Sequence, residues 1–368
     1  MFKRRLKSLP VLLYHYVRAV PGPMSRSVAI FEEQCRLLAE NGIRGVGLTE
    51  AEAFLANGEE LPPGSVLITF DDGYLDNYVY AWPVLQKYGH KATIFAVTDR
   101  LTAAGSGVRP TLAEVWAGSR KEEELPDVSG EGPDEFGHTI RRDPYLTWDE
   151  ARLMEQSGVI DIAGHSLGHN SVLAGPEHSG FVTPGPQGCN YARCLKPSFY
   201  WGMPNHKRIP ELSGPAYLPH PDLEAAVKAL VPQEGPAVLE FFAAADKVEA
   251  LRRLVESFLQ GRMETRDEQA ARYATLLAEN QSVFRRELGH ESRSLCWPWG
   301  KFCQEALRAG QEAGFAVFYT TAYGVNPAGK PLAVNRFKAK HDRISTLPGR
   351  VRLYSRPWLG ALYTKIRM

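Results

Sequence analysis

The sequence is poor in long apolar runs and in charge of a single sign. Its 368 residues carry 43 Lys and Arg against 42 Asp and Glu, for a formal charge of +1. This balance excludes a strongly basic nucleic-acid binder, so no nucleic-acid partner is expected. No run of 18 apolar residues occurs, which argues against a transmembrane segment. The proportions, 44% hydrophobic and 23% charged, are typical of a folded globular protein.

Cysteine is sparse as well. The five cysteines form an odd and scattered set, which favours a protein of a reducing compartment over a disulfide scaffold. Cys189 and Cys194 could bind a metal or pair with each other, but no second cysteine-rich element supports a zinc knuckle.

The basic start of the chain imitates a signal peptide without completing one. Residues 2–7 read Phe-Lys-Arg-Arg-Leu-Lys, but the apolar stretch that follows is short and is interrupted by residues 14–16, Tyr-His-Tyr. We therefore expect a cytoplasmic protein with no clear signal peptide. Its basic leader could still make it peripheral to a membrane surface.

Short apolar runs alternate along the chain with longer amphipathic ones. The runs predicted to be strands are rich in Val, Ile, Phe and Tyr and are bounded by Gly, Pro or Asp. This alternation is typical of a parallel sheet or barrel, so the predicted fold class is α/β. The predicted strands cover residues 11–17, 66–70, 92–97, 159–163, 295–298, 316–320 and 333–337, and the predicted helices between them cover residues 30–40, 49–57, 75–87, 147–157 and 301–313.

Two stretches interrupt the alternation. Residues 101–145 are rich in Gly, Pro and charge and lack periodicity, which indicates a long loop region near a barrel mouth. Residues 171–291 begin as a loop-like segment dense in Gly, Pro and aromatic residues and continue with a helical pattern. We predict a barrel formed by residues 1–170 and 292–345, an insertion at 171–291 that ends in a small helical subdomain, and a C-terminal tail at 346–368.

The first group of candidate site residues ends an apolar strand. Residues 67–73 read Leu-Ile-Thr-Phe-Asp-Asp-Gly, which leaves the adjacent carboxylates of Asp71 and Asp72 at the strand end. Adjacent residues there can point in different directions, so one carboxylate can hold a metal while its neighbour takes a proton. The alternative is an Asp-Gly turn that merely ends the strand.

The second group is a pair of histidines at the end of another apolar strand. His165 and His169 are four residues apart, and in a helical turn two such imidazoles can converge on one ion. Pairs at this spacing also occur by chance. Together with Asp72 they would form a site of two histidines and one carboxylate with open positions, which suits a catalytic ion.

Two further features are weaker. Residues 295–300 read Leu-Cys-Trp-Pro-Trp-Gly, in which aromatic side chains can wall a sugar-binding groove and a backbone N–H can face a developing oxyanion. The alternative is a tight turn whose tryptophans pack in the core. His15 lies in the first apolar strand and becomes a general-acid candidate only if the barrel brings it to the other motifs.

The Asp-Asp-Gly strand end, the His-x-x-x-His strand end and the aromatic-Pro-aromatic-Gly turn together resemble the NodB-type polysaccharide deacetylases of carbohydrate esterase family four. Residues 11–15, Val-Leu-Leu-Tyr-His, are similar to the first strand of the branch that includes poly-β-1,6-N-acetylglucosamine deacetylases. The resemblance implies a distorted (β/α)7 barrel with loop and helical insertions. Its site would lie at the C-terminal ends of the strands.

The resemblance also implies a metal site. Asp72, His165 and His169 would hold a divalent ion, with zinc as the default and iron, cobalt, nickel or manganese as alternatives. Ser166 would support the loop that carries the two histidines.

Catalytic and substrate-binding roles follow from the same resemblance. Asp71 would be the general base for the attacking water and His15 the general acid for the departing amine. The backbone N–H of Trp299 would complete the oxyanion site. Tyr74, Trp297 and Trp299 would contact the carbohydrate, and the products would be acetate and a free amino sugar.

The sequence departs from the family pattern in two places. Many members carry an arginine just before the third motif to orient the base, whereas Cys296 and Trp297 occupy that neighbourhood here. Arg336, in the last predicted strand, could supply this cation. The late Leu-x-His of the family is absent, and His341 lies in a polar segment, so the acid role falls to His15.

The leading functional hypothesis is a metal-dependent hydrolase of C–N bonds other than peptide bonds, which removes N-acetyl groups from an amino-sugar glycan or glycoconjugate. One alternative is hydrolysis of another C–N bond, in a formamido sugar or a nitrogenous metabolite. A second is a glycan-binding barrel without turnover. The insertion at 171–291 could contact the carbohydrate substrate or a partner.

Overall fold

The computed structural model describes residues 5–18, 24–133, 137–141, 143–185, 199–258, 260–339 and 343–367. Cys189, Cys194 and His341, about which the sequence raised expectations, lie outside these ranges.

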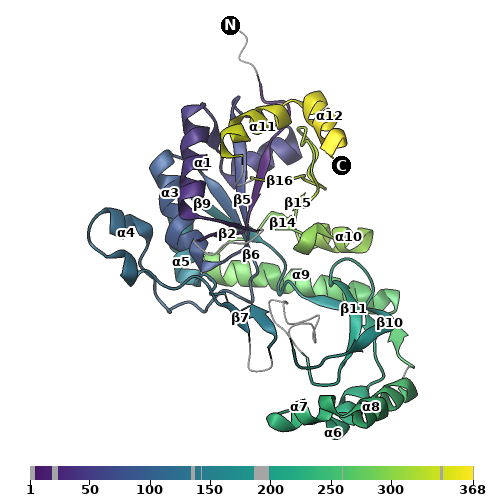
Figure 1. Ribbon diagram of the computed structural model, residues 1–368. Coiled ribbons are helices and arrows are strands. Elements are labelled where there is room, and N and C mark those ends of the chain that lie inside the picture. The colour runs from purple at the N-terminus through teal and green to yellow at the C-terminus, as the bar shows by residue number, and fades with distance from the viewer. Residues whose placement is uncertain are drawn as a thin grey trace.

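An eight-stranded sheet, in which every described pairing is parallel, forms the centre of the molecule (Figure 1). Its strands follow the order β15-β14-β9-β6-β5-β1-β16, and β4 pairs with β5. A parallel bridge between Tyr319 and Val334 joins β15 to the residues that lead into β16, so the sheet curls back on itself. The predicted distorted barrel is confirmed. The strands are β1 (Val11–Tyr14), β4 (Arg44–Gly45), β5 (Ser65–Asp72), β6 (Ala92–Ala96), β9 (Ile160–Gly164), β14 (Ser294–Cys296), β15 (Val317–Tyr319) and β16 (Phe337–Lys338).

Helices connect these strands and pack on the outside of the sheet (Figure 1). Side-chain caps mark where they begin: the Ser27 hydroxyl accepts the Ile30 N–H, and Thr147 and Glu150 cap each other's backbone at the start of α5. The helices around the sheet are α1 (Val28–Glu40), α2 (Leu48–Glu52), α3 (Trp82–Tyr88), α5 (Trp148–Gln156), α9 (Arg266–Leu288) and α10 (Gln304–Glu312).

The alternation of side chains along each strand produces two separate cores. In β5, Leu67 packs inside the barrel, whereas Ile68 and Phe70 pack outside against the helices. All eight residues of β5 are buried because both faces of the sheet are covered. The period of two places Asp71 on the same inner face as Leu67 and Thr69, so its carboxylate enters the barrel mouth.

The segment between β9 and α9 extends away from the barrel (Figure 1). Where loops were expected, β10 (Ser171–Phe181) and β11 (Pro204–Pro210) form an antiparallel pair. Three helices then share a core of their own, which includes Val227, Phe241 and Leu251. The second and third of these helices are separate, because Ala244 between them adopts an extended backbone. The helices are α6 (Leu223–Leu230), α7 (Pro236–Ala243) and α8 (Ala245–Ser257).

The remaining elements are short or terminal. The loop region expected over 101–145 contains a short helix and a two-stranded sheet, and the residues after 346 form two helices. No helix within the described residues is long and apolar enough to cross a membrane. These elements are α4 (Leu112–Trp116), α11 (Leu347–Tyr354), α12 (Pro357–Arg367), β2 (Tyr16–Val17), β3 (Ser25–Arg26), β7 (Glu131–Pro133), β8 (Thr139–Arg141), β12 (Tyr217–Leu218) and β13 (Arg262–Met263).

Candidate active site

Strand register brings the candidate residues to one end of the barrel. Tyr14 of β1 pairs with Phe70 of β5, so His15 and Asp71, which follow them, stand level with each other. On the other side of β5, Asp72 pairs with Ala96, which in turn pairs with Gly164 just before the histidine loop. Parallel strands end on the same side, so residues distant in sequence meet there.

Asp71 and Arg336 form a buried, two-pronged ion pair. Arg336 Nη1 lies 2.6 Å from Asp71 Oδ1, and Nη2 lies 2.8 Å from Oδ2. The guanidinium also donates to the Thr320 carbonyl and to the Thr69 hydroxyl, which fixes its plane. Burial raises the pKa of Asp71, but the charge and hydrogen bonds of Arg336, together with the charges of His165 and His15, outweigh burial and hold that pKa below its usual value. Arg336 thus lies where a cation could orient the base.

Asp72, His165 and His169 converge on one point. Their potential ligand atoms all lie within 4.8 Å of one another. The Nε2 atoms of His165 and His169 lie 3.4 and 3.7 Å from Asp72 Oδ1. Two imidazole nitrogens and one carboxylate oxygen are a suitable donor set for a divalent transition metal.

The hydrogen bonds around this cluster leave the donor atoms available to an ion. His165 Nδ1 lies 2.7 Å from the Cys296 carbonyl, to which it donates, and this leaves Nε2 as the ring atom that faces Asp72 and could bind an ion. Asp72 Oδ1 and His169 Nδ1 are buried and have no hydrogen-bond partner within the described residues. Burial lowers the pKa of His169 to about 4, so its ring is neutral at neutral pH. The residues present therefore fit a divalent cation.

Backbone strain is concentrated in the same place. Within the described residues, Asp72, Ser166, His169 and Trp299 are the non-glycine residues with positive φ, at 77, 66, 50 and 54°. Each such residue costs on the order of 1–3 kcal/mol and persists only where its surroundings enforce it. All four stand at the strand ends that form this cluster, which is a mark of a functional site.

The loop that carries His165 and His169 is held in place by the long helix α9. The Ser166 hydroxyl accepts the His169 N–H at 2.9 Å and closes the turn between the two histidines. The buried amide of Asn280 donates at 2.9 Å to both the Ser166 carbonyl and the Thr98 hydroxyl. Sequence reasoning missed Asn280, because nothing in its helical neighbourhood marks a contact with a loop more than a hundred residues away.

His15 lies beside the two carboxylates and is partly exposed. Burial lowers the pKa of His15, and the negative charges of Asp71 and Asp72 oppose that shift without cancelling it. The side-chain amide of Asn77 donates to the His15 carbonyl at 2.9 Å and fixes the backbone there. The structure therefore brings His15 into the electrostatic environment of the other candidate residues.

The three expected carbohydrate-contacting residues are placed differently. Trp299 is 46% exposed, and its ring centroid lies 4.1 Å from that of His169. Trp297 and Tyr74 are 0 and 1% exposed. Trp297 is stacked between two core phenylalanines and Tyr74 between two tyrosines. The expectation that these two side chains touch substrate is not met, because neither has surface to offer.

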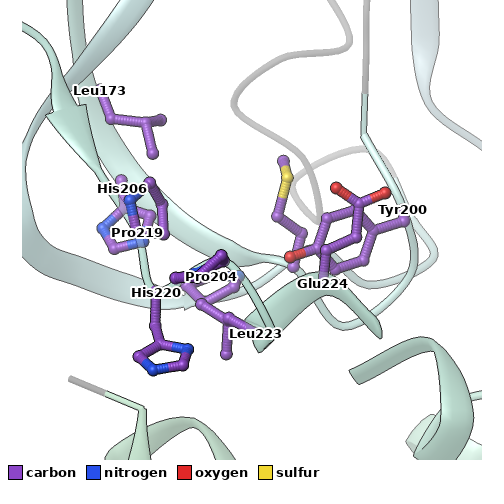
Figure 2. Close-up of a pocket in the computed structure, with 10 residues that line it drawn as sticks. Leu173, Tyr200, Pro204, His206, Pro219, His220, Leu223 and Glu224 are labelled. Carbon is purple, nitrogen blue, oxygen red and sulfur yellow. The ribbon is translucent and has the colours of Figure 1, made fainter. Parts of the chain in front are cut away.

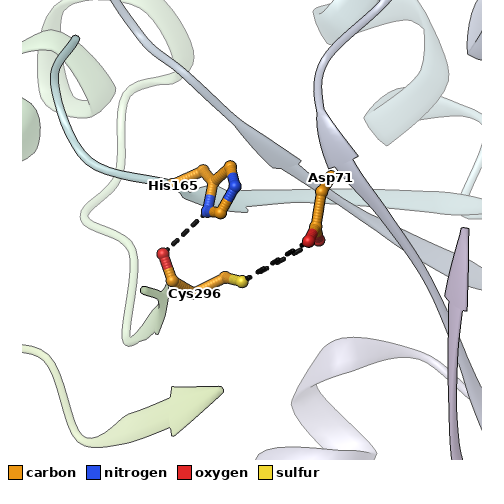
Figure 3. A group of neighbouring side chains, drawn as sticks. All are labelled: Asp71, His165 and Cys296. Atoms are coloured by element: carbon orange, nitrogen blue, oxygen red, sulfur yellow. Dashed lines mark hydrogen bonds between the residues drawn. The ribbon is translucent and has the colours of Figure 1, made fainter. Parts of the chain in front are cut away.

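Cys296 adds a second group of potential ligands. Its thiol lies 3.8 and 3.9 Å from the two carboxylate oxygens of Asp71, and its carbonyl accepts from His165 (Figure 3). Arg336 Nη2 lies 2.9 Å from the sulfur. Asp71 is already paired with Arg336, so the cluster around Asp72 is the better cation site.

A separate pocket of about 280 Å³ lies in the segment between β9 and α9 (Figure 2). His206, His220, Tyr200 and Glu224 contribute polar groups to its wall, and Leu173 and several prolines contribute apolar ones. It contains none of the strand-end residues described above.

The fold and the site together define a class of protein. It is a curled α/β barrel with a strained cluster of acidic and histidine side chains at the carboxyl ends of its strands. Residues 58–184 match the polysaccharide deacetylase family. The match covers about a third of the chain.

The chain is similar, over part of its length, to proteins found by sequence comparison. It is 42% identical over 89 residues to YxkH of Bacillus subtilis, a protein named for the same family, and 27% identical over 146 residues to poly-β-1,6-N-acetyl-D-glucosamine N-deacetylase of Escherichia coli. The matches span 24 and 39% of this chain, and 32 and 18% of those proteins.

Solved structures share the fold. A de-N-acetylase from Aggregatibacter actinomycetemcomitans superposes with a TM-score of 0.56 at 20% identity, covering 92% of this chain and 99% of that one. The BpsB deacetylase domain from Bordetella bronchiseptica gives 0.54 at 21% identity, covering 90 and 96%.

Proposed function

We propose that this protein is a metal-dependent hydrolase that removes N-acetyl groups from an amino-sugar glycan or glycoconjugate. One observation carries the proposal: the cluster of Asp72, His165 and His169 adjoins the ion-paired carboxylate of Asp71 at a single barrel mouth. The match of residues 58–184 to the polysaccharide deacetylase family and the partial similarity to a protein named poly-β-1,6-N-acetyl-D-glucosamine N-deacetylase support this class of substrate.

A divalent ion, zinc by default, would be held by Asp72, His165 and His169. When bound, it supplies a Lewis acid that polarises the acetamide carbonyl and makes water more acidic. Asn280 and Ser166 keep the histidine loop in the geometry that this ligand set requires.

The neighbouring residues move protons and contact the substrate. Asp71 accepts the proton of the attacking water, and its two bonds to Arg336 keep it ionised and aimed. His15 donates a proton to the departing amine nitrogen. The backbone N–H of Trp299 contributes to the oxyanion site, while its exposed indole forms a wall against which a sugar ring can lie.

The test is acetate release by zinc-reconstituted protein from N-acetylglucosamine oligomers and nucleotide-linked N-acetyl sugars. We expect release that a chelator abolishes. Asp71→Asn should retain the metal and lose at least about a hundredfold in turnover, because it removes the base and keeps the ligands. His165→Ala should lose the metal. Equal metal loss in both variants would show that the roles of Asp71 and Asp72 are misassigned.

Failure to release acetate from any substrate, with metal still bound, would overturn the deacetylase proposal. It would favour another C–N bond or a binding protein without turnover.

A further inference from the structure

Charge is distributed unevenly along this almost neutral chain. Residues 1–31 contain six Lys and Arg and no Asp or Glu. Residues 313–368 contain ten Lys and Arg and a single Asp. The intervening residues, 32–312, hold the other 27 basic residues against 41 acidic ones. Both ends of the sequence are therefore strongly positive and the middle is negative.

Parts of the two basic segments, residues 5–9 and the residues around 325–330 and 357–367, meet at one end of the barrel. Ser8 forms a β-bridge with Pro327, and Gly360 of α12 packs so closely on Val325 that a Cβ would not fit. Because residues 5–9 precede β1, this is the end where the strands begin, whereas the candidate active site lies where they finish. Figure 1 shows α11 and α12 at this end, with α6, α7 and α8 at the other.

Helix α12 exposes an apolar stripe at this end. Trp358, Leu362 and Ile366 are 70, 51 and 76% exposed, and their spacing of four residues places them on one face of the helix. Lys365 is exposed beside them, and Gly360 is buried on the opposite face. A helix with Trp, Leu and Ile on its outer face and basic residues around them is typical of elements that lie in a membrane interface.

Exposed cations lie at the same end of the barrel as the stripe. Arg352 reaches the carbonyl of Asn41 at the end of α1, which places it at the same end of the barrel. Glu59 and Glu60 also lie at this end, and Arg5 pairs with Glu60. Exposed basic side chains at this end include Arg5, Lys7, Lys330, Arg352, Arg356 and Lys365.

We propose that α12 and these basic residues bind the surface of a bilayer that contains anionic lipid. The apolar stripe enters the interface, and the surrounding cations contact the lipid phosphates. A bilayer at this end of the barrel leaves the candidate active site facing away from it. Membrane binding can therefore be measured separately from turnover. The proposal of membrane binding does not depend on the proposed deacetylase activity.

The test is co-sedimentation of the full chain with vesicles of phosphatidylglycerol and phosphatidylcholine, compared with vesicles of phosphatidylcholine alone. We expect binding to the anionic vesicles, which weakens as salt shortens the Debye length from about 10 Å at 0.1 M to about 3 Å at 1 M. The double variant Leu362→Ser/Ile366→Ser should reduce the vesicle affinity about tenfold or more, and Lys365→Glu should reduce it as well. The matched control, Leu230→Ser/Leu239→Ser, removes exposed leucines at the opposite end of the molecule and should bind as the parent does.

Three results would overturn the proposal. The first is a lack of dependence on the proposed features: either equal binding to both vesicle types, or binding that the α12 variants do not change. For the variants, circular dichroism melting curves that match the parent show that the fold is intact. The second is absence of vesicle binding together with a dimer in light scattering that Leu362→Ser/Ile366→Ser dissociates, which would assign the stripe to a second copy of the chain. The third is binding to both heparin and vesicles that Leu362→Ser/Ile366→Ser does not weaken. That result would show only a general attraction of the protein to polyanions.

Discussion

Replacing Arg336 with leucine isolates the pair on which the proposed base depends. The side chains of Arg336 and Asp71 are 0 and 3% exposed, so removing the guanidinium leaves a carboxylate buried without its cation. Breaking a buried pair in this way costs on the order of 3–5 kcal/mol. We therefore expect Arg336→Leu to lower the free energy of unfolding by about that amount at pH 7.

The pH dependence gives this prediction a sign. In the parent, the pKa of Asp71 is lower in the folded state than in the unfolded chain. The pair therefore stabilises the fold above the unfolded pKa of about 4, and that contribution is lost as the pH falls through the lower, folded value. In Arg336→Leu, protonation of Asp71 removes the buried, unpaired charge. The difference in free energy of unfolding between variant and parent should therefore shrink as the pH is lowered toward 4.

The assay is urea unfolding followed by circular dichroism, in the presence of a chelator, at several pH values. Arg336→Lys is the matched control, because it keeps the charge and loses the two-pronged geometry, and it should fall between parent and leucine variant. Adding Asp71→Asn to Arg336→Leu should restore part of the lost stability. A loss below about 1 kcal/mol at pH 7, no larger than for a surface ion pair, would refute the reasoning.

Two further predictions address the rest of the site, and a third addresses Asp76, which is buried and accepts the backbone N–H of Val17. Asn280→Ala should lower zinc affinity about 10- to 100-fold by competition with a chromophoric chelator, whereas Ser282→Ala, on the exposed side of the same helix, should not; equal affinities would remove Asn280 from the support of the histidine loop. His15→Ala should slow turnover by about 10²–10⁴ without changing zinc content, and unchanged kinetics would exclude it as the acid. Burial raises the pKa of Asp76 to about 8, so the parent should lose stability progressively as the pH rises from about 4 to 8. Asp76→Asn should show a shallower decline of the urea midpoint over the same pH range. Parallel curves of midpoint against pH for the two proteins would contradict the raised pKa.

The sequence by itself determined the class of fold and identified most of the residues that meet at the barrel mouth. Short β-branched runs alternating with amphipathic segments predict strands and helices from interactions between near neighbours, and such alternation favours a parallel sheet. The residues that end those runs, Asp71, Asp72 and His165, were for the same reason predicted to meet at one edge. Placing them required only strand direction, not detailed packing.

Only the tertiary structure decided which side chains touch. Arg336 was a candidate cation from its strand position, but its contact with Asp71, 265 residues away, depends on the curl of the sheet and the reach of a long side chain. Trp297 and Tyr74 looked like groove residues and are buried, while Asn280 looked like an ordinary helical residue and holds the histidine loop. Local sequence sets backbone preferences within a few residues, whereas burial and long-range hydrogen bonds are decided by how whole elements pack, and no neighbouring residue encodes that.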